Sequence, residues 1–333
     1  METSKNETTI LPPPPSIIMS LRTGFDAIAG HITAILFPLA LDLFLWLGPH
    51  LSVSQLFMTT LGEVKKLFAD TGVAAPDLQS LDQMQTSLNQ INIFSALRTL
   101  PIGVSSLISS KGSMQTPFGA PLTLQVDTLV HFYAGMFLFI FAGWVLGGLY
   151  FRWIASLVLN ADLQISVGHA VVQTLVYSLI WSLLFWILGM PAAFILYLIF
   201  MLNPLIGQGV LLFIGFLSMW LVVPIFFSAL GMFVRRQNAV ASILSSFQTA
   251  RFTMPSSSLF VLTILMVGIG LNFLWAIPSD DSWLTLIGIL GHAFVTTALL
   301  ASSFIYYRDM TVWIQAVLDR MRSSLPKQPT QQA

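Results

Sequence analysis

The chain has 333 residues, of which 56% are hydrophobic and 8% are charged. Soluble domains usually carry about a quarter charged residues, so this composition excludes a soluble globular protein. The formal net charge is zero, no basic tract indicates a nucleic-acid partner, and the absence of cysteine excludes disulfides and thiolate metal ligands. The partner that the composition does predict is the lipid bilayer.

Six apolar stretches approach or exceed the roughly 20 residues that a helix needs to cross the hydrocarbon core. We therefore predict an all-α integral membrane protein with six transmembrane helices. Each outward stretch ends in aromatic residues and a proline, and each return ends in arginine, which indicates three hairpins. The predicted spans are Ile32 to Leu47, Leu129 to Phe151, Val171 to Leu188, Val210 to Val234, Leu259 to Ile277 and Trp283 to Tyr307.

The N-terminal part divides into a tail and an amphipathic helix. Residues 1–15 contain four consecutive prolines and are predicted to form a disordered tail with polyproline character. Within residues 16–50, apolar side chains recur at helical spacing from Ile17 to Ile28, and Arg22 and Asp26 lie on another face. Such a helix would lie on the inner membrane surface before the chain turns at Gly30-His31 into the first span.

Residues 51–128 form a predicted outer insertion. Two apolar stripes, at about 53–68 and 78–91, predict a pair of amphipathic helices. The stretch from 99 to 127 is rich in proline, glycine and serine and is expected to be irregular. The insertion would form a small, mostly helical cap, whose helices pack on each other, on the outer leaflet or on a partner.

The five remaining spans, with cytoplasmic interfacial helices, occupy residues 129–322, and 323–333 form a second disordered tail. One interfacial helix is expected at 240–247 with Asn238 as its N-cap. Residues 190–207 either lengthen the third span or form a re-entrant piece, and Pro191 favours a break. Gly143 and Gly147 are four residues apart and predict a close-packing face on the second span.

The distribution of basic residues predicts the orientation. Ten of the fourteen lie on the side that holds both termini, and the two short connectors on the other side have none. Because basic residues in short loops remain in the cytoplasm, both termini are expected there. A long outer insertion without cysteine favours a bacterial plasma membrane.

The similarity of the three hairpins has two explanations. The exits at Pro49, Pro191 and Pro278 and the returns at Arg152, Arg235-Arg236 and Arg308 can reflect a triplicated unit. Interface chemistry alone also places tryptophan, proline and arginine at these depths. The three-hairpin architecture is the same under either explanation.

Asp42 and His292 are the polar residues with the strongest functional signal. Asp42 lies roughly 9 Å below the outer end of its span and His292 roughly 13 Å below the start of the sixth, at 1.5 Å per helical residue. An aspartate and a histidine at similar depth would relay a proton or hold a cation, and His131 would extend the group outward. The alternative is that both serve helix packing through local hydrogen bonds.

Four arginines at the inner ends of the returning spans are candidate lipid-phosphate contacts. They are Arg152, Arg235, Arg236 and Arg308. Guanidinium groups match phosphate geometry, but the positive-inside rule explains the same residues as simple anchors.

Catalytic motifs are missing from the sequence. It has no phosphate-binding lysine loop, no zinc-binding histidine pair, no nucleophile elbow and no haem attachment site. We therefore expect no enzyme activity, no cofactor and no metal in this chain. A nucleotide-driven step would need a separate ATPase or other membrane subunit.

The cytoplasmic helix before each odd-numbered span, together with the final-span ending from Tyr306 to Met310, resembles a broad group of bacterial six-span proteins. These are akin to the membrane domain attached to some glycerophosphodiester phosphodiesterases. The long outer insertion departs from that group, and the chain has no phosphodiesterase domain, so that activity is not carried over.

Three hypotheses follow for function. The first is a non-enzymatic scaffold or membrane subunit of a transport or envelope system that handles lipidic or amphiphilic material. The second is a proton- or cation-coupled transporter that uses Asp42 and His292. The third, an intramembrane enzyme, requires both of these residues and His131 to converge on one cavity.

Overall fold

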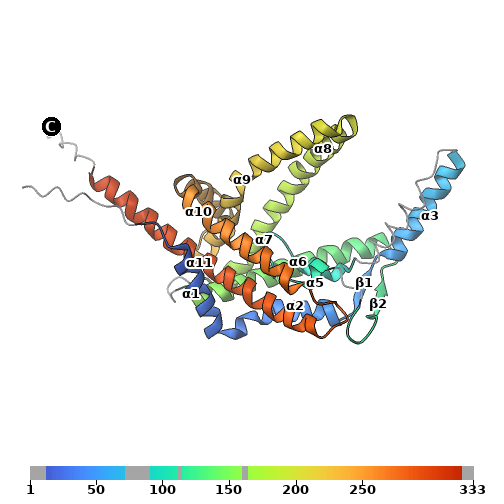
Figure 1. Cartoon of the computed structure of the whole chain (residues 1–333). Helices are drawn as coiled ribbons and strands as arrows, with labels where there is room; N and C mark the ends of the chain where they lie inside the picture. The colour runs from blue at the N-terminus through green and yellow to red at the C-terminus, as the bar shows by residue number, and fades with distance from the viewer. Residues whose placement is uncertain (1–12, 72–90, 112–114, 160–163, 325–333) are drawn as a thin grey trace, which may run out of the picture.

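A computed structural model describes residues 13–71, 91–111, 115–159 and 164–324. These residues are mostly helical, and their only sheet is a short pair of parallel strands (Figure 1). Among them are five helical stretches long and apolar enough to span a membrane, and a bent pair that would make a sixth. The chain therefore has the architecture of an all-α, multi-pass membrane protein. The five stretches are Leu129–Val158, Val167–Leu202, Pro204–Val234, Ala239–Trp275 and Leu284–Arg322.

The bent pair begins with α1 (Ile17–Gly30), which is N-capped by the Ser16 side chain. A 3₁₀ turn, η1 (Ile32–Ile35), then leads into α2 (Leu36–Leu47), and the chain bends by 96° between α1 and this continuation. The turn at Gly30-His31 is thus where the sequence predicted it. Helix α1 also packs on α11, where a side chain at Gly24 would come within 2.7 Å of the Ser302 Cα.

The segment between α2 and α6 contains short elements and one longer helix. Strand β1 (His50–Ser52) pairs in parallel with β2 (Thr123–Gln125), with His50 opposite Thr123. Helix α3 (Ser54–Thr71) confirms the first predicted amphipathic helix and projects away from the bundle in Figure 1. The second, at 78–91, falls almost wholly outside the described residues. A 3₁₀ helix, η2 (Ile93–Leu97), and the short α5 (Ile108–Lys111) complete this segment.

Helix α6 (Leu129–Val158) is followed by a long helical hairpin, and the far end of this hairpin projects from the bundle in Figure 1. Its first arm runs through α7 (Val167–Leu184), a single π-helical turn, η4 (Phe185–Gly189), and α8 (Met190–Leu202). Its second arm is α9 (Pro204–Val234), which Asn203 caps through the N–H groups of Leu205 and Ile206.

Pro191 does not break the third span, contrary to the prediction. It lies in the first turn of α8, directly after η4. The wider π turn changes the hydrogen-bond register, so the absent N–H of proline is accommodated without ending the helix. The 36 residues of Val167–Leu202 would extend roughly 54 Å, well beyond the ~30 Å hydrocarbon core, so this arm has to tilt or protrude.

The last two helices are α10 (Ala239–Trp275) and α11 (Leu284–Ser324). Asn238 caps α10 by accepting a hydrogen bond from the Ala241 N–H at 2.8 Å, as predicted. The amphipathic stretch at 240–247 is not a separate interfacial helix, because α10 continues from it into the fifth span. The helix passes through Pro255 without ending.

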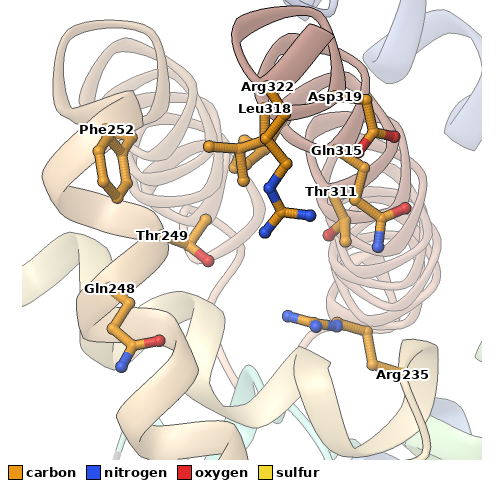
Figure 2. A pocket seen from close by; sticks show the side chains of 10 residues that line it. Arg235, Gln248, Thr249, Phe252, Thr311, Gln315, Leu318, Asp319 and Arg322 are labelled. Carbon is orange, nitrogen blue, oxygen red and sulfur yellow. The ribbon is translucent and has the colours of Figure 1, made fainter. Parts of the chain in front are cut away.

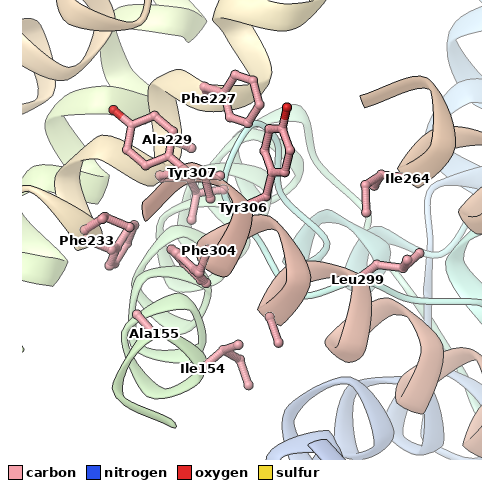
Figure 3. Packing of buried hydrophobic residues seen from close by; sticks show 14 of the residues in the cluster. Ile154, Ala155, Phe227, Ala229, Phe233, Ile264, Leu299, Phe304, Tyr306 and Tyr307 are labelled. Atoms are coloured by element: carbon pink, nitrogen blue, oxygen red, sulfur yellow. The ribbon is translucent and has the colours of Figure 1, made fainter. Parts of the chain in front are cut away.

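Aromatic side chains form the centre of the bundle where α6, α9, α10 and α11 meet (Figure 3). The Tyr306 ring stacks on Phe260 with centroids 3.9 Å apart and an interplanar angle of 3°. Phe233 meets Phe304 edge to face at 5.9 Å. Since lipid chains are as apolar as these side chains, close packing rather than water exclusion holds such helices together.

Candidate functional site

Residues 99–111, here called the plug segment, enter the helical bundle instead of covering it. Ile102, Val104, Leu107 and Ile108 are all almost completely buried, and so is the Ser106 hydroxyl. The sequence predicted only that this stretch is irregular and part of an outer cap. Non-helical backbone within a membrane is tolerated only where protein surrounds it, and the residues from Ile102 to Ile108 meet that condition, whereas Leu100 before them is exposed.

Glycines on α6 make room for the plug segment and the residues before it. A side chain at Gly143 would come within 2.5 Å of the Leu97 carbonyl oxygen, and one at Gly147 within 2.7 Å of the Gly103 Cα. The predicted close-packing face is therefore real, but it receives the end of η2 and the plug segment and not another membrane span. Trp144 on the same helix donates from Nε1 to the Leu100 carbonyl at 3.3 Å.

Asp42 holds the plug segment through three hydrogen bonds. Its side chain is fully buried on α2, roughly 7.5 Å from the end of that helix at Leu47. Oδ1 accepts from the Ser106 hydroxyl at 2.6 Å and the Ile108 N–H at 3.1 Å, and Oδ2 accepts from the Leu107 N–H at 3.1 Å. A buried carboxylate is stable only with such donors, so the structure gives this charge a specific role.

His292 lies beside Asp42, as the similar depths predicted. Its Nδ1 is 3.6 Å from Asp42 Oδ2, and the imidazole is almost completely buried on α11. This distance is too long for a hydrogen bond, and Nδ1 has no hydrogen-bond partner in the described structure. One turn deeper, the Ser105 hydroxyl donates to Thr296 at 2.8 Å, which ties the plug segment to α11 as well.

An ion pair closes the C-terminal end of the plug segment. Lys111 Nζ is 2.6 Å from Asp280 Oδ1 and also donates to the Pro278 carbonyl at 2.6 Å. Trp46 Nε1 donates to the Asp280 carbonyl at 2.8 Å. This contact was not predicted from the sequence. The signal in the sequence was a lysine in the predicted insertion and an aspartate pair in a connector that has no basic residue of its own.

His131 is not part of this cluster. It lies exposed in the first turn of α6, where its backbone N–H donates to the Thr128 hydroxyl at 3.2 Å. The described structure contains no contact between His131 and either Asp42 or His292. The three residues on which the enzyme hypothesis depends therefore do not converge.

Three of the four predicted lipid-phosphate arginines bind backbone carbonyls near the connection from α6 to α7. These bonds run from Arg152 to Ile165 at 2.8 Å, from Arg236 to Gln164 at 2.9 Å and from Arg308 to Val158 at 3.1 Å. Only the Val158 carbonyl lies at a helix C-terminus, where a cationic side chain stabilises the free carbonyls, while Gln164 and Ile165 lie in the loop before α7. Arg235 differs, because it lines a cavity described below.

An apolar groove of about 480 Å³ lies between α2, α6 and the plug segment. Val104 contributes the plug segment's side of the groove, and all of the lining residues are apolar. They are Leu36, Phe37, Ala40, Leu41, Phe44, Leu97, Val104, Leu146 and Trp153. Because α2 lines the groove from its first turn almost to its last, the groove runs along a helix that is itself a predicted span.

His50 is a second histidine next to the outer end of α2. Burial lowers the pKa of its imidazole below the ordinary value of 6.5, and a backbone hydrogen bond to Leu45 acts in the opposite direction. Its Nε2 is buried without a hydrogen-bond partner in the described structure. His50 is therefore a group whose protonation opposes folding.

Metal binding finds no support in the described residues, where no three histidine, aspartate or glutamate side chains come together. Comparison with known proteins gives no direct guide to the site. No family model matches the chain, and no curated protein or solved structure matches it. What the site does has to be argued from its own geometry.

Proposed function

We propose that the chain is a six-span protein of a bacterial plasma membrane, built as three hairpins with both termini in the cytoplasm. The proposal counts the bent pair from Ile17 to Leu47 as the first span, in addition to the five long apolar stretches. The gathering of arginines at the inner ends of the returning spans supports the orientation. Since the chain has no cysteine, single cysteines at Ser110 and Ser323 would be labelled from opposite sides of sealed vesicles if it is correct.

In this membrane the protein acts as a non-enzymatic scaffold or membrane subunit of a transport or envelope system that handles lipidic or amphiphilic material. The observation that carries the proposal is the apolar groove between α2, α6 and the plug segment. A groove lined only by apolar side chains, along a membrane helix, suits an acyl chain or a similar apolar chain. Any nucleotide-driven step in such a system belongs to a separate subunit.

Filling the groove tests this function. Ala40 lines the groove, so Ala40→Trp would occupy its space, whereas Ala193 is exposed on α8 and Ala193→Trp is the matched control. Native mass spectrometry of the purified protein should find a retained phospholipid with the unmodified chain and with Ala193→Trp, but not with Ala40→Trp. Equal retention in all three proteins, or none in the unmodified chain, would reject the groove as the binding site.

A proton- or cation-coupled transporter is the second candidate. It is favoured by the 3.6 Å approach of His292 Nδ1 to Asp42, with that nitrogen lacking a hydrogen-bond partner in the described structure. In proteoliposomes carrying a pH-sensitive dye, His292→Gln should then reduce proton or cation flux. Flux equal to that of the unmodified protein would remove this candidate. The intramembrane enzyme gains no support, because His131 lies outside the cluster.

A further inference from the structure

A second cavity lies at the other end of the molecule, where α9 ends and α10 and α11 diverge. It has a volume of about 510 Å³. Arg235, at the C-terminal end of α9, lines one side, and Arg322, near the end of α11, lines the other. Both guanidinium groups point toward the same space in Figure 2. Two positive charges that share a cavity would repel each other unless an anion lay between them.

Charge within the cavity supports an anionic ligand. Among the described residues, neither Arg235 nor Arg322 has a carboxylate within ion-pair distance. Asp319 also lines the cavity, but its carboxylate points away from the space between the two guanidinium groups in Figure 2. The space between the arginines therefore keeps an excess of positive charge.

The other lining residues define the class of anion. Gln248 and Thr249 on α10 and Gln315 on α11 supply neutral hydrogen-bond donors around the arginines, whereas the Thr311 hydroxyl already donates to the Tyr307 carbonyl. Guanidinium groups bind phosphate oxygens in pairs, and amide and hydroxyl donors complete such sites. The Phe252 ring forms an apolar wall beside them (Figure 2).

We propose that this cavity binds a phosphate ester, with Arg235 and Arg322 holding the phosphate group between α10 and α11. The cavity lies at the inner end of the molecule: Thr311 follows the predicted last span, and Gln248 precedes the fifth. This position gives access both to the headgroups of inner-leaflet phospholipids and to soluble phosphate esters. The site is separate from the groove at α2, so it stands whether or not the proposed lipid-handling function is correct.

The experiment uses the full chain in maltoside micelles and compares two single-charge variants. Arg322→Gln removes one arginine from the cavity. Because Arg322 is exposed in the last turn of α11, the substitution should not impair folding. Arg251→Gln is the control, because Arg251 is exposed on α10 but does not line the cavity. Thermal unfolding in maltoside micelles, which contain no phosphate, should be the same for both variants and for the unmodified protein.

Two arms of the experiment distinguish the source of the phosphate group. In the first, phosphatidylglycerol is added to the micelles, and in the second glycerol phosphate is added to micelles without phospholipid at constant ionic strength. In each arm, the affinity is obtained from the shift of the unfolding midpoint with ligand concentration. The affinity should be at least about fivefold weaker in Arg322→Gln and unchanged in Arg251→Gln. The arm that shows this pattern identifies the lipid or the soluble ester. Equal losses in both variants, or no shift in either arm, would overturn the proposal.

Discussion

Replacing Asp42 with alanine removes the acceptor of three hydrogen bonds that hold the plug segment inside the bundle. The Ser106 hydroxyl can rotate toward another acceptor, but the Leu107 and Ile108 N–H groups have fixed directions and stay buried. An unsatisfied buried donor costs about 1 to 3 kcal/mol, and removing one member of a buried charged network about 3 to 5 kcal/mol. We expect Asp42→Ala to lower the free energy of unfolding by about 3 to 4 kcal/mol.

Asp42→Asn should have about half that effect, because an amide keeps one oxygen. That oxygen can still accept from Ser106 and Ile108, as Oδ1 does now. The NH₂ group would then face the Leu107 N–H, which leaves one donor without an acceptor. The ordering alanine, then asparagine, then aspartate is therefore a specific consequence of the observed hydrogen bonds.

Release of the plug segment can be measured with a single cysteine, since the chain has none of its own. Val104→Cys places a thiol at a buried position of the segment, and its rate of maleimide labelling reports local opening. A loss of about 3 kcal/mol raises the open population more than a hundredfold. Asp281→Asn, at an exposed outer carboxylate, is the control. If Asp42→Ala labels no faster than this control and unfolds at the same temperature, Asp42 does not anchor the segment.

Three further variants test neighbouring contacts. A double-mutant cycle of Lys111→Met and Asp280→Asn, measured by thermal unfolding, should give a coupling energy of about 1 to 2 kcal/mol, since the pair is largely buried. Additive effects of the two substitutions would show that the ion pair does not contribute to stability. Gly147→Ala should destabilise by more than 1 kcal/mol because of the close backbone of the plug segment, whereas Gly135→Ala, with its nearest neighbour at 3.7 Å, should not destabilise at all. Because burial lowers the His50 pKa, the unfolded chain binds a proton more readily than the folded chain does. The free energy of unfolding should therefore fall as the pH drops below about 6.5, and this pH dependence should be weaker in His50→Gln.

The sequence was sufficient to predict the helices that hydrophobic periodicity and N-cap residues indicate. Asn238 capped its helix where expected, α3 began and ended close to the predicted stripe, and Asp42 and His292 met as their depths implied. These predictions rest on local spacing along one helix or on depth measured along two. Both quantities follow from the rise of 1.5 Å per residue.

The plug segment could not be predicted in the same way. Residues 99–111 have no helical or strand period, and their burial depends on α6 glycines that follow them by about 40 residues. The sequence marked Gly143 and Gly147 as a packing face but did not say what packs there. Pro191 was misjudged for a related reason, because a π turn that accommodates proline leaves no regular signature in the residues before it.

The same hydrogen bonds also separate the two functional candidates. A cation bound at Asp42 would compete with the Ser106, Leu107 and Ile108 donors for the same two oxygens, so binding would have to displace the plug segment. A structural anchor makes no such demand. We therefore expect the labelling rate of Val104→Cys to stay the same when sodium or potassium replaces choline at constant ionic strength. A rate that rises with one of these cations, and no longer does so in Asp42→Asn, would show that ion binding and plug release are coupled and would favour the transporter over the scaffold.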